Sequence, residues 1–322
     1  MDGAKRTVNS LWKEEESALG GGVTVAILDT GLYPHNDFVK RADRILAFKD
    51  FIDGHGQPYD NNGHGTHVAG IIAGDGYESD GKYCGLAPKC KLVGIKVLRK
   101  DGSGNISDVL AGIQWVIDNK DKYGIKVMNL SVGMEDFEGE SSALVKSVDV
   151  AWDQNIVVVC AAGNNGPNRG SITSPGISRK VITVGSSDDM EAVKIQADMA
   201  NNYSGRGPTK DCIKKPDVVA PGCNIISCHC DPSYLPRKVG YLTDRAGYIK
   251  KSGTSMSTPI VTGVLARVLS DFPDLSNRDL KLLMKYSTND LGFPQEQQGW
   301  GLLDLKKLYG NIIRFTNQEK TT

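Results

Sequence analysis

Apolar runs of strand length alternate with helical patterns along most of the chain, and this alternation limits the possible folds more than any other feature. The strand-like runs are apolar throughout, as in VTVAIL at Val23–Leu28 and IVVVCA at Ile156–Ala161. Strands that are buried on both faces have this composition, and in α/β proteins they form parallel sheets covered by helices. We therefore expect an α/β fold with a mostly parallel sheet and helices on both faces.

Periodicity and capping residues place the individual elements. The expected strands are Val23–Leu28, Leu92–Leu98, Val127–Val132, Ile156–Ala161 and Val181–Gly185. The expected helices are His64–Ala73, Ser107–Asn119 with Ser107 as its cap, Ser141–Trp152, one beginning within SGTSMSTPIVTGVLARVL at Ser252–Leu269, and Asn277–Tyr286 capped by Ser276. No repeat or linker interrupts the pattern. We expect an N-terminal segment over residues 1–22 and a single domain over residues 23–322.

Charge and cysteine content narrow the class of protein. The 38 basic and 38 acidic residues cancel, so nothing points to a nucleic-acid partner or a membrane surface. No run reaches transmembrane length and the N-terminus lacks the apolar stretch of a signal peptide. An odd number of cysteines is typical of free thiols in a reducing compartment, which predicts a cytoplasmic protein. The alternative is the mature fragment of a secreted precursor, in which a Cys84–Cys90 disulfide would form.

The cysteines themselves leave one further alternative open. The seven are Cys84, Cys90, Cys160, Cys212, Cys223, Cys228 and Cys230. The cluster that runs from Cys223 to Cys228-His229-Cys230 contains zinc-binding residue types. Its spacing is not that of a common zinc ribbon or finger, so free thiols are the simpler interpretation.

Two residues with acid–base chemistry lie where an α/β sheet places its sites. Asp29 ends the first strand, at the edge where ligands bind, although an Asp before Gly31 also suits a turn. His64 begins a helix between two glycines, which allow a backbone or a substrate to come close. His67 follows one turn later, but the His-Glu-x-x-His pattern of a zinc protease is absent. We therefore interpret His67 as structural.

A hydroxyl and an amide complete a pattern suited to acyl transfer. Ser255 lies at the start of a helix, where backbone N–H groups and the dipole favour negative charge. Asn164 follows the most apolar strand, and its amide suits a developing oxyanion as well as a turn. A serine nucleophile needs an imidazole to accept its proton and a carboxylate to orient that imidazole. The chain supplies these groups in the order Asp, His, Asn, Ser.

Four motifs carry a resemblance to a known family. They are DTG at Asp29–Gly31, HGTHVAG at His64–Gly70, AAGN at Ala161–Asn164 and GTSMSTP at Gly253–Pro259. Together they resemble the signature blocks of the subtilisin-like serine endopeptidases, the subtilase family, and the likeness is greatest to its signal-peptide-free bacterial branch. The match runs from Val23 to about residue 305. It implies the three-layer subtilisin-like fold and a protease that acts on proteins or peptides with broad specificity.

The resemblance also implies a role for each motif residue. Ser255 would be the nucleophile, His64 the general base and acid, and Asp29 the carboxylate that orients His64. Asn164 would donate to the oxyanion, with the backbone N–H of Ser255 as a second donor. Two alternatives stay open: a catalytically inactive homologue that binds peptides, and a peptide ligase that uses the same acyl-enzyme.

Further positions are assigned to substrate and metal by the same resemblance. Two segments would hold an extended substrate between them, and three residues would form the pocket for the side chain before the cut. The segments are Gly102, Ser103, Gly104 and Ser131, Val132, Gly133; the pocket residues are Ala161, Gly163 and Thr173. Thr173 stands where some relatives have Gly, which predicts a shallow pocket. The chemistry requires no cofactor.

A structural calcium ion is a separate expectation of the resemblance. Asp37 matches a calcium ligand of many subtilisins. The loop Asp75–Lys82 differs from theirs, and Asp75, Glu78 and Asp80 are either replacement ligands or a solvated acidic loop.

Overall fold

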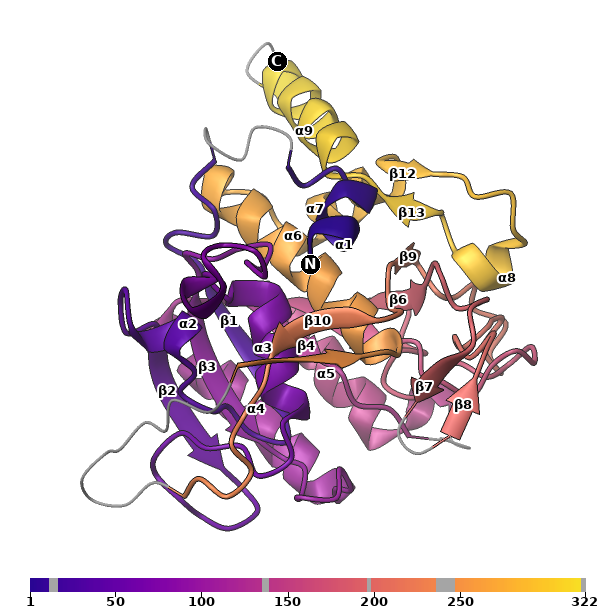
Figure 1. Cartoon of the computed structure of the whole chain (residues 1–322). Coiled ribbons are helices and arrows are strands. Elements are labelled where there is room, and N and C mark those ends of the chain that lie inside the picture. The colour runs from indigo at the N-terminus through magenta and orange to yellow at the C-terminus, as the bar shows by residue number, and fades with distance from the viewer. Residues whose placement is uncertain (12–16, 135–138, 196–197, 236–246, 320–322) are drawn as a thin grey trace.

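The computed structural model describes residues 1–11, 17–134, 139–195, 198–235 and 247–319. In these residues, the main sheet has nine strands in the order β12-β13-β9-β6-β5-β4-β1-β3-β2 (Figure 1). The strands of this sheet are β1 Thr24–Asp29, β2 Ile45–Asp50, β3 Lys91–Lys96, β4 Ile125–Leu130, β5 Val157–Ala161, β6 Ile182–Ser186, β9 Val218–Ala220, β12 Thr288–Asn289 and β13 Leu302–Leu303. Every neighbouring pair is parallel except β12–β13.

Two antiparallel pairs lie outside the main sheet, and helices cover it. The pairs are β7 Val193–Ile195 with β8 Asp198–Ala200, and β10 Ile225–Cys228 with β11 Tyr248–Lys251. The helices are α1 Asp2–Thr7, α2 Asn36–Val39, α3 His64–Ala73, α4 Ile106–Tyr123, α5 Ala143–Asp153, α6 Thr254–Asp271, α7 Asn277–Lys285, α8 Gln295–Gln298 and α9 Leu305–Glu319. Short 3-10 turns occupy Tyr77–Ser79 and Gly139–Ser141.

The two central helix pairs lie on opposite faces of the sheet. Successive strand residues point to opposite faces, so Leu28 and Asp29 of β1 mark the two sides. A Cβ added at Gly112 of α4 would lie 3.3 Å from the Leu28 side chain, and one added at Gly65 of α3 would lie 3.0 Å from Asp29 Cβ. Helix α6 packs beside α3, and α5 beside α4. The three-layer α/β fold expected from the sequence is therefore confirmed.

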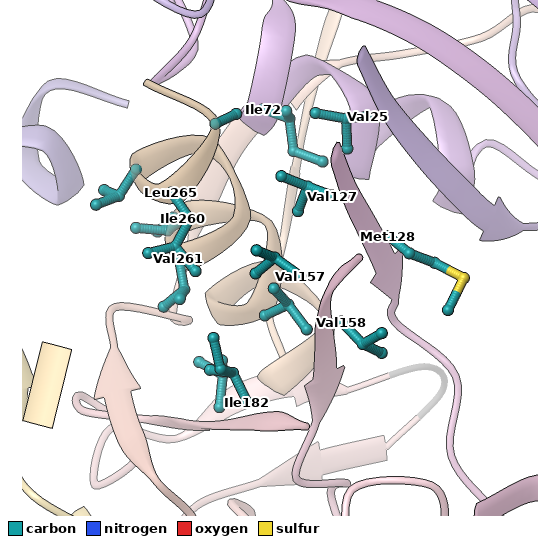
Figure 2. Close-up of a cluster of buried hydrophobic side chains, with 14 of the residues drawn as sticks. Val25, Ile72, Val127, Met128, Val157, Val158, Ile182, Ile260, Val261 and Leu265 are labelled. Carbon is teal, nitrogen blue, oxygen red and sulfur yellow. The ribbon is translucent and has the colours of Figure 1, made fainter. Parts of the chain in front are cut away.

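The core forms where α6 crosses the parallel strands. Figure 2 shows Ile260 and Val261 of α6 on the same side of the sheet as Val127 and Val157, while Met128 points to the other side. All of these side chains are buried, and most are fully so. Burying an aliphatic side chain of this size stabilises the fold by about 1.5–3 kcal/mol. The long apolar stretch after the serine motif is thus a helix that packs on one face of the sheet, against its central strands.

The expected helices and central strands are present, with shifts at their ends. Helix α4 begins at Ile106 and its N-cap is Asn105, not Ser107, because the chain is still extended at residue 105. The cap at Ser276 is confirmed, since its hydroxyl accepts from the N–H of Asp279. The edge strand β2 was missed although it begins with the apolar residues ILAF; as an edge strand, most of its residues are only partly buried or exposed.

The N-terminal residues pack into the domain. Met1, Ala4 and Val8 belong to the main core cluster, and the N–H of Leu305 bonds to the carbonyl of Val8. The buried Arg267 of α6 also bonds to the carbonyl of Ser10. The boundary at residue 22 stays a prediction.

Candidate active site

Asp29 and His64 meet at the carboxyl edge of the sheet. Asp29 is the last residue of β1 and His64 the first of α3, and Nδ1 of His64 lies 2.7 Å from Oδ1 of Asp29. The backbone N–H of Thr30 donates to the same oxygen at 2.7 Å. Asp29 is fully buried, whereas the His64 side chain is 24% exposed. A carboxylate that accepts from Nδ1 leaves Nε2 facing outward as a base.

The first turn of α3 is held by Asp60, which the sequence analysis did not single out. Its Oδ1 accepts from the Thr30 hydroxyl at 3.0 Å and from the Gly63 N–H at 2.8 Å. Its Oδ2 accepts from both the N–H and the hydroxyl of Thr66. Asp60 lies three residues before Gly63, the N-cap of α3, so the usual N-cap pattern does not identify it. Because Thr30 adjoins Asp29, this network fixes His64 relative to Asp29.

Lys96 is a second residue that the sequence analysis missed. It ends β3 directly opposite Asp29, is fully buried, and donates to the Thr30 carbonyl at 2.5 Å and the Leu98 carbonyl at 2.8 Å. Burial lowers the pKa of Lys96, and the nearby carboxylate of Asp60 opposes that shift most strongly. The sequence does contain a signal for this residue, because Lys96 lies inside the apolar run LVGIKVL of an expected buried strand. Its ammonium places positive charge behind the buried carboxylate of Asp29.

Ser255 is the second residue of α6 and lies close to the end of β4. The N-cap of α6 is Gly253, two residues before Ser255. The φ angle of Gly253 is 137°, a value that favours glycine. The Ser255 hydroxyl donates to the carbonyl of Ser131 at 3.1 Å, and the Ser131 hydroxyl donates to the carbonyl of Ser255 at 3.2 Å. Ser255 is half-buried between buried neighbours. Among the described residues the Ser255 hydroxyl bonds to Ser131 and not to His64. Hydrogen bonds between catalytic groups often form in full only when substrate is bound.

Asn164, in the loop after β5, is oriented by the helix that carries Ser255. Its Oδ1 accepts from the N–H of Thr254 at 2.9 Å and from the Thr254 hydroxyl at 3.0 Å. The cap of α6 therefore comes from Asn164, because no side chain at the N-cap position bonds to the helix. Since Oδ1 is occupied, the Nδ2 donors point elsewhere. The N–H of Ser255 forms no backbone hydrogen bond with a described residue.

Thr173 lies between the two segments assigned to the pocket before the cut. A Cβ at Gly133 would lie 2.4 Å from its hydroxyl oxygen, and one at Gly163 would lie 2.5 Å from it. Thr173 is buried, and its hydroxyl bonds to no other described residue. Ala161 ends β5 next to this pocket, and Ser131, Val132 and Gly133 follow β4, becoming more exposed along the segment. Gly133, Gly163 and Thr173 thus lie close together. Their assignment to a substrate pocket stays a prediction.

The segment Gly102, Ser103 and Gly104 forms an exposed turn after β3. The N–H of Arg99 bonds to the carbonyl of Ser103 at 2.7 Å. The Asn62 amide donates to the carbonyl of Lys100 at 2.8 Å. Because Asn62 is two residues before His64, the turn lies on one flank of the histidine.

Asp37 does not offer the free oxygens that a calcium ion requires. It is fully buried, and its carboxylate accepts from the N–H groups of Gly76 and Glu78, both at 3.1 Å, and from the Tyr248 hydroxyl at 2.9 Å. Calcium is bound by six to eight oxygens whose lone pairs face the ion. Asp75 instead accepts from the N–H of Tyr77 at 2.9 Å. The described groups around Asp37 therefore fit a hydrogen-bonded turn and do not fit calcium.

The buried group of His35, Asp37 and Cys228 is also hydrogen-bonded. Three of their ligand-type atoms lie within 4.8 Å of one another. However, Nδ1 of His35 accepts from the N–H of Asp37 at 3.1 Å, and Nε2 lies 2.8 Å from the carbonyl of Gly247. Both ring nitrogens are engaged. A metal would have to displace these bonds, so the group carries no metal-site assignment.

The cysteines are free thiols in this structure, and the clustered ones point to different places. The Cys223 thiol donates to the carbonyl of Asp188 at 2.8 Å, Cys228 lies beside Asp37, and Cys230 lies against Gly63. Burial raises the pKa of Cys230 to about 12, whereas zinc binds the thiolate.

No helix among the described residues is long and apolar enough to cross a membrane. The cytoplasmic location stays a prediction.

Comparison with known proteins decides the family. The model of the subtilase family (Peptidase S8) matches residues 20–301, which include every motif residue above. The chain belongs to the subtilase family. It is 44% identical over 282 residues to serine protease AprX of Bacillus subtilis, an alignment that covers 85% of this chain and 63% of AprX. It is 33% identical to Subtilisin Savinase of Lederbergia lenta, covering 85% of this chain and 86% of that protein.

Solved structures agree with this assignment. A crystal structure of a cold-adapted subtilisin-like serine proteinase superposes with a TM-score of 0.68 at 31% identity, and covers 88% of this chain and 89% of that chain. Sphericase gives a TM-score of 0.67 at 29% identity. The chain spans 63% of AprX and 61% of the subtilisin of Bacillus sp. TA39. The family of serine endopeptidases that the four motifs predicted is thus confirmed.

Proposed function

We propose that this subtilase is a serine endopeptidase in which Ser255, His64 and Asp29 form the catalytic triad and Asn164 donates to the oxyanion. The observation that carries the proposal is the position of Asn164. Its Oδ1 is held by the N–H and hydroxyl of Thr254, so its Nδ2 donors remain next to the serine that follows. The bond between Nδ1 of His64 and Oδ1 of Asp29, at 2.7 Å, supports the catalytic triad.

The chemical steps follow from this arrangement. Ser255 Oγ attacks the substrate carbonyl carbon while Nε2 of His64 takes the hydroxyl proton. The resulting oxyanion accepts from Nδ2 of Asn164 and from the N–H of Ser255, and Asp29 stabilises the imidazolium. His64 then protonates the departing amine, which leaves an acyl-enzyme on Ser255. Water, deprotonated by His64, attacks this ester and releases the acid and the free serine.

The substrate-binding residues support cleavage after small side chains in many sequence contexts. The exposed backbone of Gly102–Gly104 and Ser131–Gly133 would pair with an extended substrate, and main-chain pairing tolerates varied side chains. Thr173 occupies space between Gly133 and Gly163, where a larger side chain would otherwise enter. We therefore propose broad specificity with a preference for a small residue before the cut.

The test is digestion of unfolded casein, with mass analysis of all products. The wild-type chain should cleave it, mostly after small residues, and Ser255→Ala should reduce the rate by roughly four orders of magnitude or more. Ser257→Ala, two residues away and buried, is the matched control and should retain activity. Undiminished cleavage by Ser255→Ala would contradict the proposal. Products that join two segments which are not adjacent in the casein sequence would instead identify a ligase.

A further inference from the structure

The hairpin β10–β11 leads into the nucleophile and is fixed to α3. Its second strand ends at Lys251, four residues before Ser255. The Ser227 hydroxyl donates to the carbonyl of His67 at 2.8 Å. Nε2 of His67 lies 3.1 Å from the carbonyls of both Ile225 and Ile249, one on each strand. The hairpin therefore has a defined position relative to the first turns of α3, where His64 lies.

The hairpin forms the second flank of His64. A Cβ at Gly63 would lie 2.9 Å from Cys230 Sγ and 3.7 Å from His229 Nδ1. On the other flank, Asn62 contacts the turn that leads to Gly102–Gly104. In the proposed function that turn holds the acyl half of the substrate. The hairpin flank is consequently the side on which the leaving-group half lies.

Lys251 projects from the hairpin toward this flank. In the antiparallel register Ser227 lies opposite Ile249, so their side chains share a face, and Ser227 bonds to α3. Lys251 is two residues after Ile249 and shares that face, whereas Lys250 lies on the opposite face and is exposed. Burial lowers the pKa of His229, and the positive charge of Lys251 is the next largest cause.

Lys251 is half-buried, and its ammonium has no counter-ion among the described residues. No described residue forms a salt bridge or hydrogen bond with it. Two carboxylates are close enough to influence His229, those of Asp60 and Asp231. Asp60 is occupied by the first turn of α3, and Asp231 accepts from the N–H and hydroxyl of Ser233. The cation beside the leaving-group half is thus available to an incoming negative group.

We propose that Lys251 binds a carboxylate in the leaving-group half of the peptide substrate. Cleavage then favours bonds that are followed closely by Asp or Glu, or by a free C-terminus. This inference rests on the proposed function and assigns a specificity-determining residue to the same site. Partly exposed ion pairs contribute about 0.2–1 kcal/mol, which corresponds to a change in rate of up to about fivefold.

The test compares three peptides that share one acyl half. The first has neutral residues and an amidated end after the bond, the second has Glu in the second position after the bond with an amidated end, and the third is neutral with a free carboxylate. At low ionic strength, kcat/KM should be roughly two- to fivefold higher for a peptide with a carboxylate. The second and third peptides separate a side chain from a terminal carboxylate as the source.

Matched lysine variants assign the effect to one residue. Lys251→Met should remove the preference, Lys250→Met should keep it, and Lys251→Glu should reverse it toward a peptide with Lys in place of Glu. An unchanged preference in Lys251→Met, or equal loss in Lys250→Met, would overturn the inference. So would the absence of any preference in the wild-type chain.

A binding measurement separates this inference from the proposed function. Fluorescence anisotropy of labelled peptides with the Ser255→Ala chain requires no catalysis. Tighter binding of the acidic peptide, lost in Ser255→Ala/Lys251→Met, would support the role of Lys251 even if the wild-type chain cleaved nothing. Equal binding of all three peptides would contradict it, whatever the activity.

Discussion

The two ends of α6 are built in opposite ways. At its start, Ser255 is half-buried, its N–H forms no backbone hydrogen bond with a described residue, and the amide donors of Asn164 face the same space. At its other end, Arg267 is fully buried and its Nε donates to the Ser17 hydroxyl at 2.9 Å. Asp271 accepts from the N–H of Ala18 and from the Ser17 hydroxyl, both at 2.8 Å.

Under the proposed function, this difference separates catalysis from stability along one helix. Hydrogen-bond donors that are to bind a substrate oxyanion must be unpaired in the free protein, and unpaired donors lower the free energy of unfolding. The far end of α6 has no such requirement, so its charged groups are paired with the N-terminal residues. Substitutions at the two ends should therefore change different measurements.

Asn164 is the residue at which the two properties can be separated most sharply. Asn164→Asp keeps the Oδ1 acceptor for Thr254 but replaces the Nδ2 donors. We expect kcat to fall about 10²–10³-fold or more, with the melting temperature nearly unchanged. Asn164→Ala removes both groups and should lose about 1 kcal/mol of stability in addition. Full activity in Asn164→Asp, measured with a small peptide amide, would refute the assignment of the oxyanion donor.

Arg267 tests the opposite end of the helix. Arg267→Met keeps much of the buried volume but removes the charged hydrogen bonds to the N-terminal residues. The free energy of unfolding in urea should fall by about 2–3 kcal/mol, while kcat/KM at a temperature well below the transition stays within twofold of the wild type. A large loss of activity with unchanged stability would show that the two ends are not separable.

The acid side of the stability curve gives a smaller effect. Burial lowers the pKa of His67 to about 3, and the charge of Lys251 contributes to this shift. In the unfolded chain the imidazole takes a proton near pH 6.5, so unfolding binds a proton between these values. Stability from this group is complete above about pH 6.5 and is lost as the pH falls towards 3, by about 2 kcal/mol at pH 5.

The variant His67→Gln tests this prediction. It keeps an N–H donor for the carbonyls of Ile225 and Ile249 but has no group that titrates. Its free energy of unfolding should change less between pH 7 and pH 5 than that of the wild type. Arg267→Met should keep the wild-type dependence. Equal pH dependence in His67→Gln and wild type would show that other groups cause the acid loss.

The same contrast explains what could be predicted from the sequence. Asp29, His64, Asn164 and Ser255 lie in short motifs, and each type of residue suits one step of acyl transfer. The contact of Asp29 with His64 and the position of Asn164 at the start of α6 could therefore be expected. The role of Asp60 could not be predicted in this way, because it contacts α3 from three residues before the N-cap.

Other features depend on partners far away in the chain. The roles of Lys96 and Arg267 follow from contacts with Thr30 and Ser17, which no local pattern contains. The first turn of α6 is capped by Asn164, which is 90 residues away in the sequence from Thr254.

The most direct test of the account is to locate a covalent adduct. The wild-type chain would be treated with a fluorophosphonate, digested with an unrelated protease and analysed by mass spectrometry. We expect one adduct, on Ser255, with none on the buried Ser257. Labelling should be lost in Ser255→Ala and strongly slowed in His64→Ala, because the hydroxyl then lacks its base. An adduct on another serine, or undiminished labelling of Ser255→Ala, would contradict the assignment of Ser255 as the nucleophile.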